Sequence, residues 1–200
     1  MTLAVDAKVV LKAYLLICLF CFWRHHYNDT HYVKPALTMD MHSRFCAIIP
    51  APFGAMGIRT ENNQLRELVY LPANIPLKTP TSALAIEAAQ QITSYFDHPA
   101  FQFTLPLAAL GTEHQRKVWR AIEQIPMGQV TNYGAIAKHI GSAPRAVGQA
   151  CGANWFPLII PCHRVTAANG IGGFANHNEA AGFHSNVKKW LLAHEGVHGY

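Results

Sequence analysis

Apolar residues between residues 43 and 71 come in short runs separated by turn-forming residues. The interrupting residues are Pro50, Pro52, Gly54, Gly57, Asn62 and Asn63. Such a rhythm is typical of short strands joined by tight turns. The pattern predicts two or three antiparallel strands in this region.

The next segment, residues 82–96, repeats its apolar positions with a different period. These positions are Leu84, Ile86, Ala88, Ala89, Ile92 and Phe96. Their spacing is closer to the 3.6-residue period of a helix than to the alternation of a strand. Together with the strands, this helix predicts a small N-terminal α/β lobe with antiparallel strands over residues 39–110.

A clearer helical pattern begins at Thr112, whose side chain can cap the first turn. Val118, Ile122 and Ile125 recur at i, i+4 and i+7, and Pro126 ends the helix.

Two shorter helices are predicted next, joined by a tight turn. Thr131 or Asn132 can cap the first, Gly141 can end it in the left-handed conformation, and Pro144 suits the first turn of the second. Two short helices around a glycine-containing turn predict a helix-turn-helix unit. The expected fold class is therefore α/β, of the α+β kind, with a mainly helical C-terminal domain over residues 111–200.

The second helix of that unit carries unusually small side chains. They are Ala146, Gly148, Ala150, Gly152 and Ala153. Small residues allow a helix to press into a DNA minor groove only about 6 Å wide, but they equally allow tight packing against a neighbouring lobe. Composition leaves both interpretations open, and on the same terms Arg145, at the head of the helix, is an ordinary surface charge.

Composition fits a folded protein with one substantial core or two small lobes, since half of the 200 residues are apolar and 14% are charged. A disordered chain would be poorer in apolar residues. The formal charge is +5, and residues 112–200 hold eight Lys/Arg against four Asp/Glu. This basic excess suits a polyanionic partner but does not establish one.

The first 38 residues contain an apolar run, residues 9–23, that is interrupted by Lys12 and is short for a membrane span. No small-residue cleavage site follows it. Met39 and Met41 stand just before the first predicted strand. We therefore expect residues 1–38 to be a dispensable extension or to result from an upstream start, and the protein to have no membrane partner.

The five cysteines are odd in number and scattered, which favours a reduced, cytoplasmic protein over a disulfide scaffold. Cys18 and Cys21, with His25 and His26 behind them, resemble half of a zinc site. We favour an accidental pairing within an apolar run and expect no metal.

The chemically distinctive segment is Pro161-Cys162-His163-Arg164, which follows the apolar run LII. We expect this segment to be a strand at the edge of buried structure. A thiolate there is a candidate nucleophile if His163 helps Cys162 to ionise. A Cys-His pair alone is more often a buried thiol beside a structural histidine.

The surrounding sequence favours a nucleophilic Cys162 over a structural Cys-His pair. The stretches VWRAIEQIPMGQVTNYGAIA, RAVGQACGAN, NWFPLIIPCHRV and KKWLLAHEG closely resemble the O6-alkylguanine-DNA alkyltransferase family, also called methylated-DNA–protein-cysteine methyltransferases. The resemblance runs from about Glu113 to Gly196, and PCHRV in this context is highly specific. Residues 43–110 match the family's variable N-terminal lobe in pattern only.

The resemblance implies DNA repair by direct reversal, in which an alkyl group moves irreversibly from O6-alkylguanine to Cys162. His163, through a water, would be the base, and Glu195 would orient that histidine. Each molecule would act once, without a cofactor. O4-alkylthymine is a further candidate substrate.

The same resemblance implies that the partner is double-stranded DNA. Tyr133 would crowd the phosphate beside the target nucleotide, and Arg145 would enter the stack where the guanine leaves. Asn154, before the expected active-site strand, matches the family's structural hinge asparagine, and we count it among the DNA-binding residues. The substrate pocket would include Tyr133, Val165 and Phe174. We assign Ala146 and Gly148 to the DNA-facing surface and expect a monomer.

Three features depart from the family pattern: a short connection from Gly141 to Arg145, Trp155 in place of a proline, and a longer loop between Phe174 and Trp190. Two rival hypotheses are a cysteine hydrolase that uses Cys162 and His163, and a helix-turn-helix regulator without catalysis. A hydrolase would turn over repeatedly, and a regulator would tolerate loss of Cys162.

Overall fold

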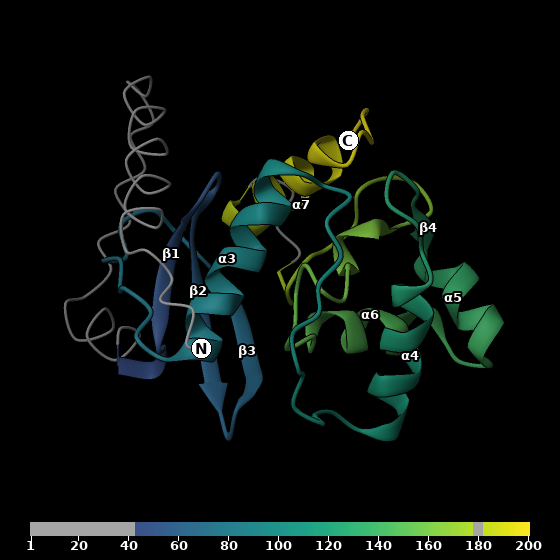
Figure 1. The fold of residues 1–200 in the computed structure, drawn as a ribbon. Helices are drawn as coiled ribbons and strands as arrows, with labels where there is room; N and C mark the ends of the chain where they lie inside the picture. The colour runs from purple at the N-terminus through teal and green to yellow at the C-terminus, as the bar shows by residue number, and fades with distance from the viewer. Residues whose placement is uncertain (1–42, 178–181) are drawn as a thin grey trace. The chain divides into compact units, whose positions relative to one another are not determined.

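The computed structural model describes residues 43–177 and 182–200 (Figure 1). The chain divides into two units, Met1–Lys34 and Pro35–Tyr200, and all described residues belong to the second. The expected N-terminal extension and its Cys18 and Cys21 pair lie outside the described residues.

Three antiparallel strands open the described chain, as the sequence predicts. They are β1 (Ala47–Ala51), β2 (Gly54–Glu61) and β3 (Gln64–Leu71), paired in that order. Asn62 and Asn63 connect β2 to β3 with φ values of 50° and 56°. Two consecutive left-handed residues are what a two-residue hairpin needs, and asparagine tolerates that conformation well.

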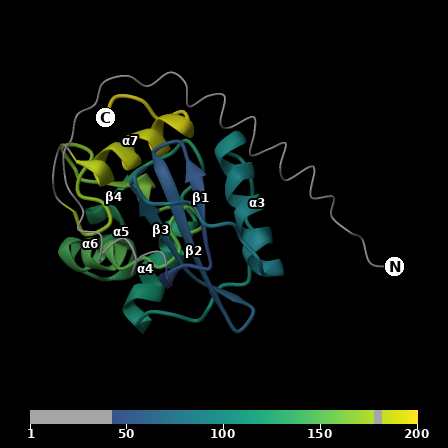
Figure 2. The ribbon, with the colours of Figure 1, turned by 90° about the vertical axis from the view of Figure 1, so that its left-hand side faces the viewer.

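Helix α3 (Ala83–Asp97) packs on this sheet and completes the predicted N-terminal α/β lobe (Figure 2). The Ser82 side chain caps it by accepting from the Ala85 amide at 3.3 Å. Ala88 and Ile92 are fully buried on the face toward the sheet. The helical period of residues 82–96 is thus confirmed.

The C-terminal part is mainly helical, as expected. It contains α4 (Glu113–Glu123), α5 (Tyr133–Ile140), α6 (Pro144–Gly152) and α7 (Phe183–His194), with a short parallel pair of strands, β4 (Thr131–Asn132) and β5 (Val165–Thr166).

The ends of these helices lie where the sequence places them. Thr112 forms a capping box with Gln115, and the Asn132 side chain accepts from the Ala135 amide at 2.8 Å. Gly141 ends α5 with a φ of 66°. Residues 141–143 therefore join α5 to α6 by a short turn, while docking of this pair on DNA as a helix-turn-helix stays a prediction.

Two glycines of α6 show that its small residues serve more than one purpose. A Cβ on Gly152 would lie 1.8 Å from Oδ1 of Asn176, so this glycine permits close packing. A Cβ on Gly148 would meet nothing within 4 Å. The C-terminal end of α6 is therefore packed, while Gly148 faces open space.

One hydrophobic core runs through both halves of the described chain. It joins Ile58 and Ile92 of the N-terminal lobe to Val118, Val147 and Leu191 of the helical part. The described residues thus belong to one unit, and the domain boundary near residue 110 stays a prediction. Within the described residues, no helix is both long and apolar enough to cross a membrane.

Candidate active site

Cys162 opens a tight turn and does not lie in a strand. Residues Cys162–Arg164 form a short 3₁₀ helix, and only then does β5 begin. The Cys162 amide donates to the Ile160 carbonyl at 2.8 Å, and the Arg164 amide donates to the Pro161 carbonyl at 2.9 Å. The expectation of a strand at PCHR was therefore wrong, because these local bonds use the groups that a strand would offer to a neighbour.

The thiol of Cys162 is buried and accepts a side-chain hydrogen bond from Asn154. Nδ2 of Asn154 donates to its Sγ at 3.3 Å. Burial raises the pKa of Cys162, while the Asn154 hydrogen bond and the charge of Lys188 oppose that rise. The resting thiol is protonated, so it must lose its proton to become a nucleophile.

His163 lies next in the chain and is fully buried. Its Nε2 is 2.9 Å from Oε1 of Glu195, and both side chains are 0% exposed. Burial lowers the pKa of His163, although the hydrogen bond and charge of Glu195 oppose this. A neutral His163 that donates through Nε2 to the carboxylate has Nδ1 free to accept a proton, and Nδ1 has no hydrogen-bond partner in the protein.

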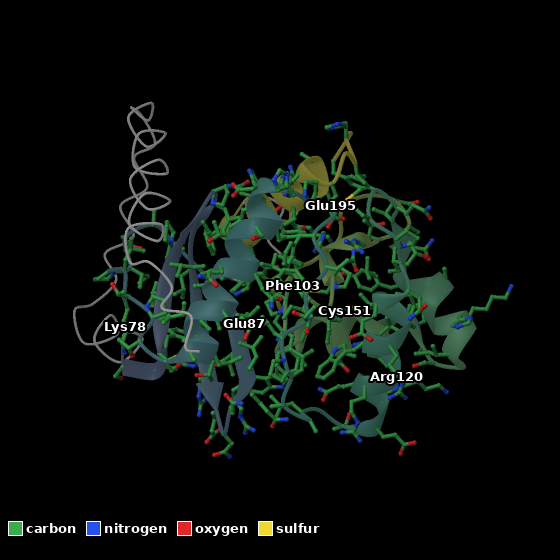
Figure 3. All side chains as sticks on the ribbon, in the orientation of Figure 1. Lys78, Glu87, Phe103, Arg120, Cys151 and Glu195 are labelled. Carbon is green, nitrogen blue, oxygen red and sulfur yellow. The ribbon has the colours of Figure 1, made fainter. Side chains whose placement is uncertain are left out.

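Glu195 is the centre of a larger ionic cluster, at the C-terminal end of α7 (Figure 3). Arg164 donates to both carboxylate oxygens, at 2.8 and 2.9 Å. The Tyr95 hydroxyl donates to Oε1 at 2.8 Å. Burial alone would raise the pKa of Glu195, but the hydrogen bonds from His163 and Arg164 hold it well below its usual range.

Arg164 and Tyr95 were missed as site residues in the sequence. Arg164 had a signal, because it belongs to the PCHR segment. Tyr95 had none, since it lies on the buried face of α3, 100 residues before its partner. Its hydroxyl brings the N-terminal lobe into direct contact with the carboxylate that orients His163.

Lys188 is a third residue that the sequence did not single out. It is fully buried on α7, and its Nζ donates to the carbonyls of Val165 at 2.7 Å, Ile171 at 2.7 Å and Gly173 at 3.2 Å. It also lies 5.7 Å from the ring centroid of Phe174. Lys188 therefore ties the strand after Cys162 to the loop that carries Phe174.

The ammonium of Lys188 also belongs to the electrostatics of the site. Burial lowers the pKa of Lys188 to about 8, against the opposing effects of Cys162 and Cys151. In return its positive charge favours the thiolate of Cys162.

Replacing Lys188 by methionine should destabilise the protein by about 3 kcal/mol, because it leaves buried carbonyls without a donor. The midpoint of urea unfolding measures this change. Lys189→Met is the matched control, since Lys189 is the exposed neighbour on the same helix. Equal midpoints for both variants would contradict the structural role of Lys188.

A pocket of about 530 Å³ opens onto Cys162. Five of the predicted site residues line it: Tyr133, Arg145, Gly148, Cys162 and Phe174. Cys151 of α6, labelled in Figure 3, contributes a second thiol to the lining. The structure thus brings the candidate nucleophile and the candidate DNA-handling residues to one cavity.

Tyr133 and Arg145 enter this pocket from consecutive helices. Tyr133 is the first residue of α5, and its hydroxyl donates to the Gly173 carbonyl at 3.0 Å. Arg145 lies exposed in the first turn of α6. Burial, followed by the charges of Cys151 and Cys162, raises the pKa of Tyr133, so its hydroxyl keeps its proton.

Three predicted residues lie beside the pocket without lining it. Val165 is fully buried, and its carbonyl accepts from Lys188. Ala146 is half-buried in α6. The Asn154 side chain makes internal bonds, which include one from its Nδ2 to the Ile160 carbonyl at 2.8 Å and the one to Cys162. Asn154 is thus placed to orient the thiol.

The departures noted in the sequence lie around the site. Trp155 is 38% exposed, and its carbonyl accepts from the Leu68 amide at 2.9 Å. Part of the longer loop, residues 178–181, lies outside the described residues.

In the part of the chain that is described, no group of three or more His, Cys, Asp or Glu residues could hold a metal ion.

Comparisons with known proteins give a consistent result. Residues 113–197 match the family model described as 6-O-methylguanine DNA methyltransferase, DNA binding domain. A methylated-DNA–protein-cysteine methyltransferase of Methanosarcina acetivorans is 34% identical over 160 residues, which cover 76% of this chain and 98% of the relative. The constitutive enzyme of that name from Bacillus subtilis is 42% identical over 60% of this chain and 69% of its own.

Solved structures agree with these relatives. The crystal structure of an O6-methylguanine methyltransferase from Mycobacterium tuberculosis is similar with a TM-score of 0.61 and 34% identity, over 74% of this chain and 90% of that one. A crystal structure of OGT from the same bacterium in complex with DNA gives the same values.

Proposed function

The chain belongs to the methylated-DNA–protein-cysteine methyltransferase family, and we propose that Cys162 is the residue on which it receives alkyl groups from O6-alkylguanine in DNA. The protein thus repairs DNA by direct reversal. One observation carries the assignment of the residue: the Cys162 thiol opens on the pocket beside a neutral His163 that Glu195 orients. This is the order of nucleophile, base and orienting carboxylate.

The transfer step follows from these groups. His163 Nδ1 takes the thiol proton through a water, and the carboxylate of Glu195 stabilises the imidazolium that forms. Sγ then bonds to the alkyl carbon, the bond from that carbon to O6 breaks, and its electron pair stays on the guanine. The imidazolium of His163 gives up the proton that it took, and the guanine gains one, so the products are a thioether on Cys162, a neutral His163 and an unmodified base.

A thioether is stable in water, so each molecule acts once. Displacement at a saturated carbon uses no metal, nucleotide or redox group, and we assign none to this site. Loss of the alkyl group from excess alkylated duplex should therefore reach a plateau of one base repaired per protein molecule. Repeated turnover would favour the rival cysteine hydrolase instead.

We assign DNA recognition to α5 and α6. A stacked guanine cannot bring its O6 atom to a buried thiol, so the nucleotide must rotate out of the duplex into the pocket. Arg145 is exposed at the pocket rim, where it can occupy the space that the guanine leaves. Gly148 keeps the face that it shares with Arg145 low enough to approach the DNA backbone. Ala146 adds a second small side chain to the same helix, and we assign Tyr133, at the start of α5, to the phosphate beside the target nucleotide.

Replacing Arg145 by alanine should slow transfer from duplex DNA about tenfold or more, because the gap left by the flipped base is no longer filled. Transfer from an alkylated single strand, where no stacked gap forms, should change much less. Single-turnover assays on both substrates measure this difference. Arg59→Ala, on β2 of the N-terminal sheet, is the matched control, and an equal effect on both substrates would argue against this role of Arg145.

Three finer assignments belong to the same proposal. A cytoplasmic location suits the three free cysteines of the described residues, Cys46, Cys151 and Cys162. We propose that one protein molecule acts on one lesion as a monomer. O4-alkylthymine is a second candidate substrate, because it presents an alkyl group on an equivalent exocyclic oxygen.

A further inference from the structure

Two buried side-chain polar atoms of the described residues have no hydrogen-bond partner in the protein: Nδ1 of His163 and the hydroxyl oxygen of Tyr70. Native proteins nearly always give such atoms a partner, and an ordered water often serves. The mechanism above uses His163 Nδ1. The hydroxyl of Tyr70 takes no part in that mechanism.

Tyr70 is the last residue but one of β3, in the N-terminal sheet. Its ring packs edge-on against Phe53, with centroids 5.3 Å apart, and lies 5.5 Å from the ring of Phe174, which lines the pocket. Burial raises the pKa of Tyr70, and the charges of Cys162, Tyr95 and Glu195 raise it further. The hydroxyl therefore keeps its proton, and its ring packs directly against a side chain that lines the pocket of Cys162.

Packing alone does not explain a tyrosine at this position. Phenylalanine would make the same ring contacts with Phe53 and Phe174 without burying a hydroxyl. A buried hydroxyl without a partner is unfavourable, so a tyrosine that packs against the pocket-lining Phe174 points to a water as the partner of this hydroxyl.

We propose that Tyr70 is a positioning residue for proton transfer, whose hydroxyl binds the same water molecule as Nδ1 of His163. The hydroxyl donates to the water oxygen, and the water donates to Nδ1. When Cys162 ionises, its proton passes to this water while a proton of the water passes to Nδ1, so the water is regenerated. The proposal rests on the proposed function for its biological purpose, but the proton transfer itself can be tested without DNA.

The test is the rate at which iodoacetamide alkylates Cys162 across a pH series, followed by peptide mass spectrometry in the full chain. Replacing Tyr70 by phenylalanine should lower this rate at neutral pH about tenfold, the effect of losing one hydrogen bond. The rising limb of the pH profile should also move to higher pH. A purely structural tyrosine would not shift that profile. Tyr200→Phe, which removes an exposed hydroxyl near the C-terminus, should leave it unchanged.

An unchanged profile in Tyr70→Phe, with equal or greater stability toward urea, would overturn the proposal, since the hydroxyl would then be merely buried. A high-resolution crystal structure is a second, independent test of the proposed water. One water within hydrogen-bond distance of both Tyr70 Oη and His163 Nδ1 is expected, and its absence would also overturn the proposal. If the profile shifts but alkylated DNA is not repaired, the proposed function fails and the proton relay stands.

Discussion

Replacing Cys162 by alanine should abolish alkyl transfer completely while the protein still folds and still binds DNA. The variant loses only a sulfur atom from a buried site, which is a change that most folds tolerate at a cost of about 1 kcal/mol. Cys151 also lines the pocket, but burial raises the pKa of its thiol, and the residue that follows it in the chain is Gly152 where Cys162 has His163. It is therefore not expected to replace Cys162 as the acceptor.

Remaining O6-methylguanine, measured after digestion of the duplex, should match the starting amount for Cys162→Ala. Fluorescence anisotropy should show DNA affinity close to that of the unaltered protein. Cys46→Ala is the matched control, because Cys46 lies at the N-terminal sheet and its thiol donates to the Ile58 carbonyl. Methyl loss from DNA in the presence of Cys162→Ala would remove Cys162 from the mechanism.

Replacing Glu195 by glutamine should both destabilise the fold and slow transfer by about 100-fold or more, since the base is no longer oriented or charge-stabilised. The carboxylate is 0% exposed and its Arg164 partner is 13% exposed. Removing one member of such a buried pair costs roughly 3–5 kcal/mol, because the other charge stays behind uncompensated. Urea unfolding and single-turnover transfer measure the two effects separately.

The same substitution should change how stability depends on pH. The folded pKa of Glu195 lies below its unfolded value. Its stabilisation is therefore complete above the unfolded pKa, near 4.3, and is lost as pH falls below that value. The difference between the unaltered protein and Glu195→Gln should shrink as the pH falls below about 4. Glu61→Gln, which removes one charge of an exposed ion pair with Arg66, is the matched control.

The elements of this fold were largely predictable because their signals are local. The helical period of residues 82–96, the capping side chain of Thr112 and the glycine that ends α5 each act within one or two turns of the chain. The Asn62-Asn63 pair likewise sets its hairpin by itself. The 3₁₀ turn at Cys162 was not predictable, since the apolar run before it has the same composition as a buried strand.

The site could be predicted only where its residues are adjacent or belong to a specific motif. Cys162 and His163 are neighbours, whereas the place of Glu195 came from the family resemblance. Tyr95 looks like an ordinary core residue on α3. Its hydrogen bond to Glu195 depends on how distant elements pack, which periodicity does not encode.

Lys188 is a case in which the sequence held a usable signal. It precedes Leu192 by four residues and Leu191 by three, so it shares the apolar face of α7 with two fully buried leucines. Burying a lysine on such a face is unfavourable unless its ammonium group donates hydrogen bonds to buried acceptors. Lys189 next to it falls on the exposed side of the helix.

The central claim is that Cys162 receives the alkyl group and keeps it. Intact-protein mass after incubation with a duplex that contains one O6-methylguanine tests this most directly, with peptide mapping to locate the change. We predict a single methyl increment on the unaltered protein, carried by Cys162, and none after incubation with an unmodified duplex. No increment while the DNA stays methylated, or a methyl group on another residue, would contradict the account.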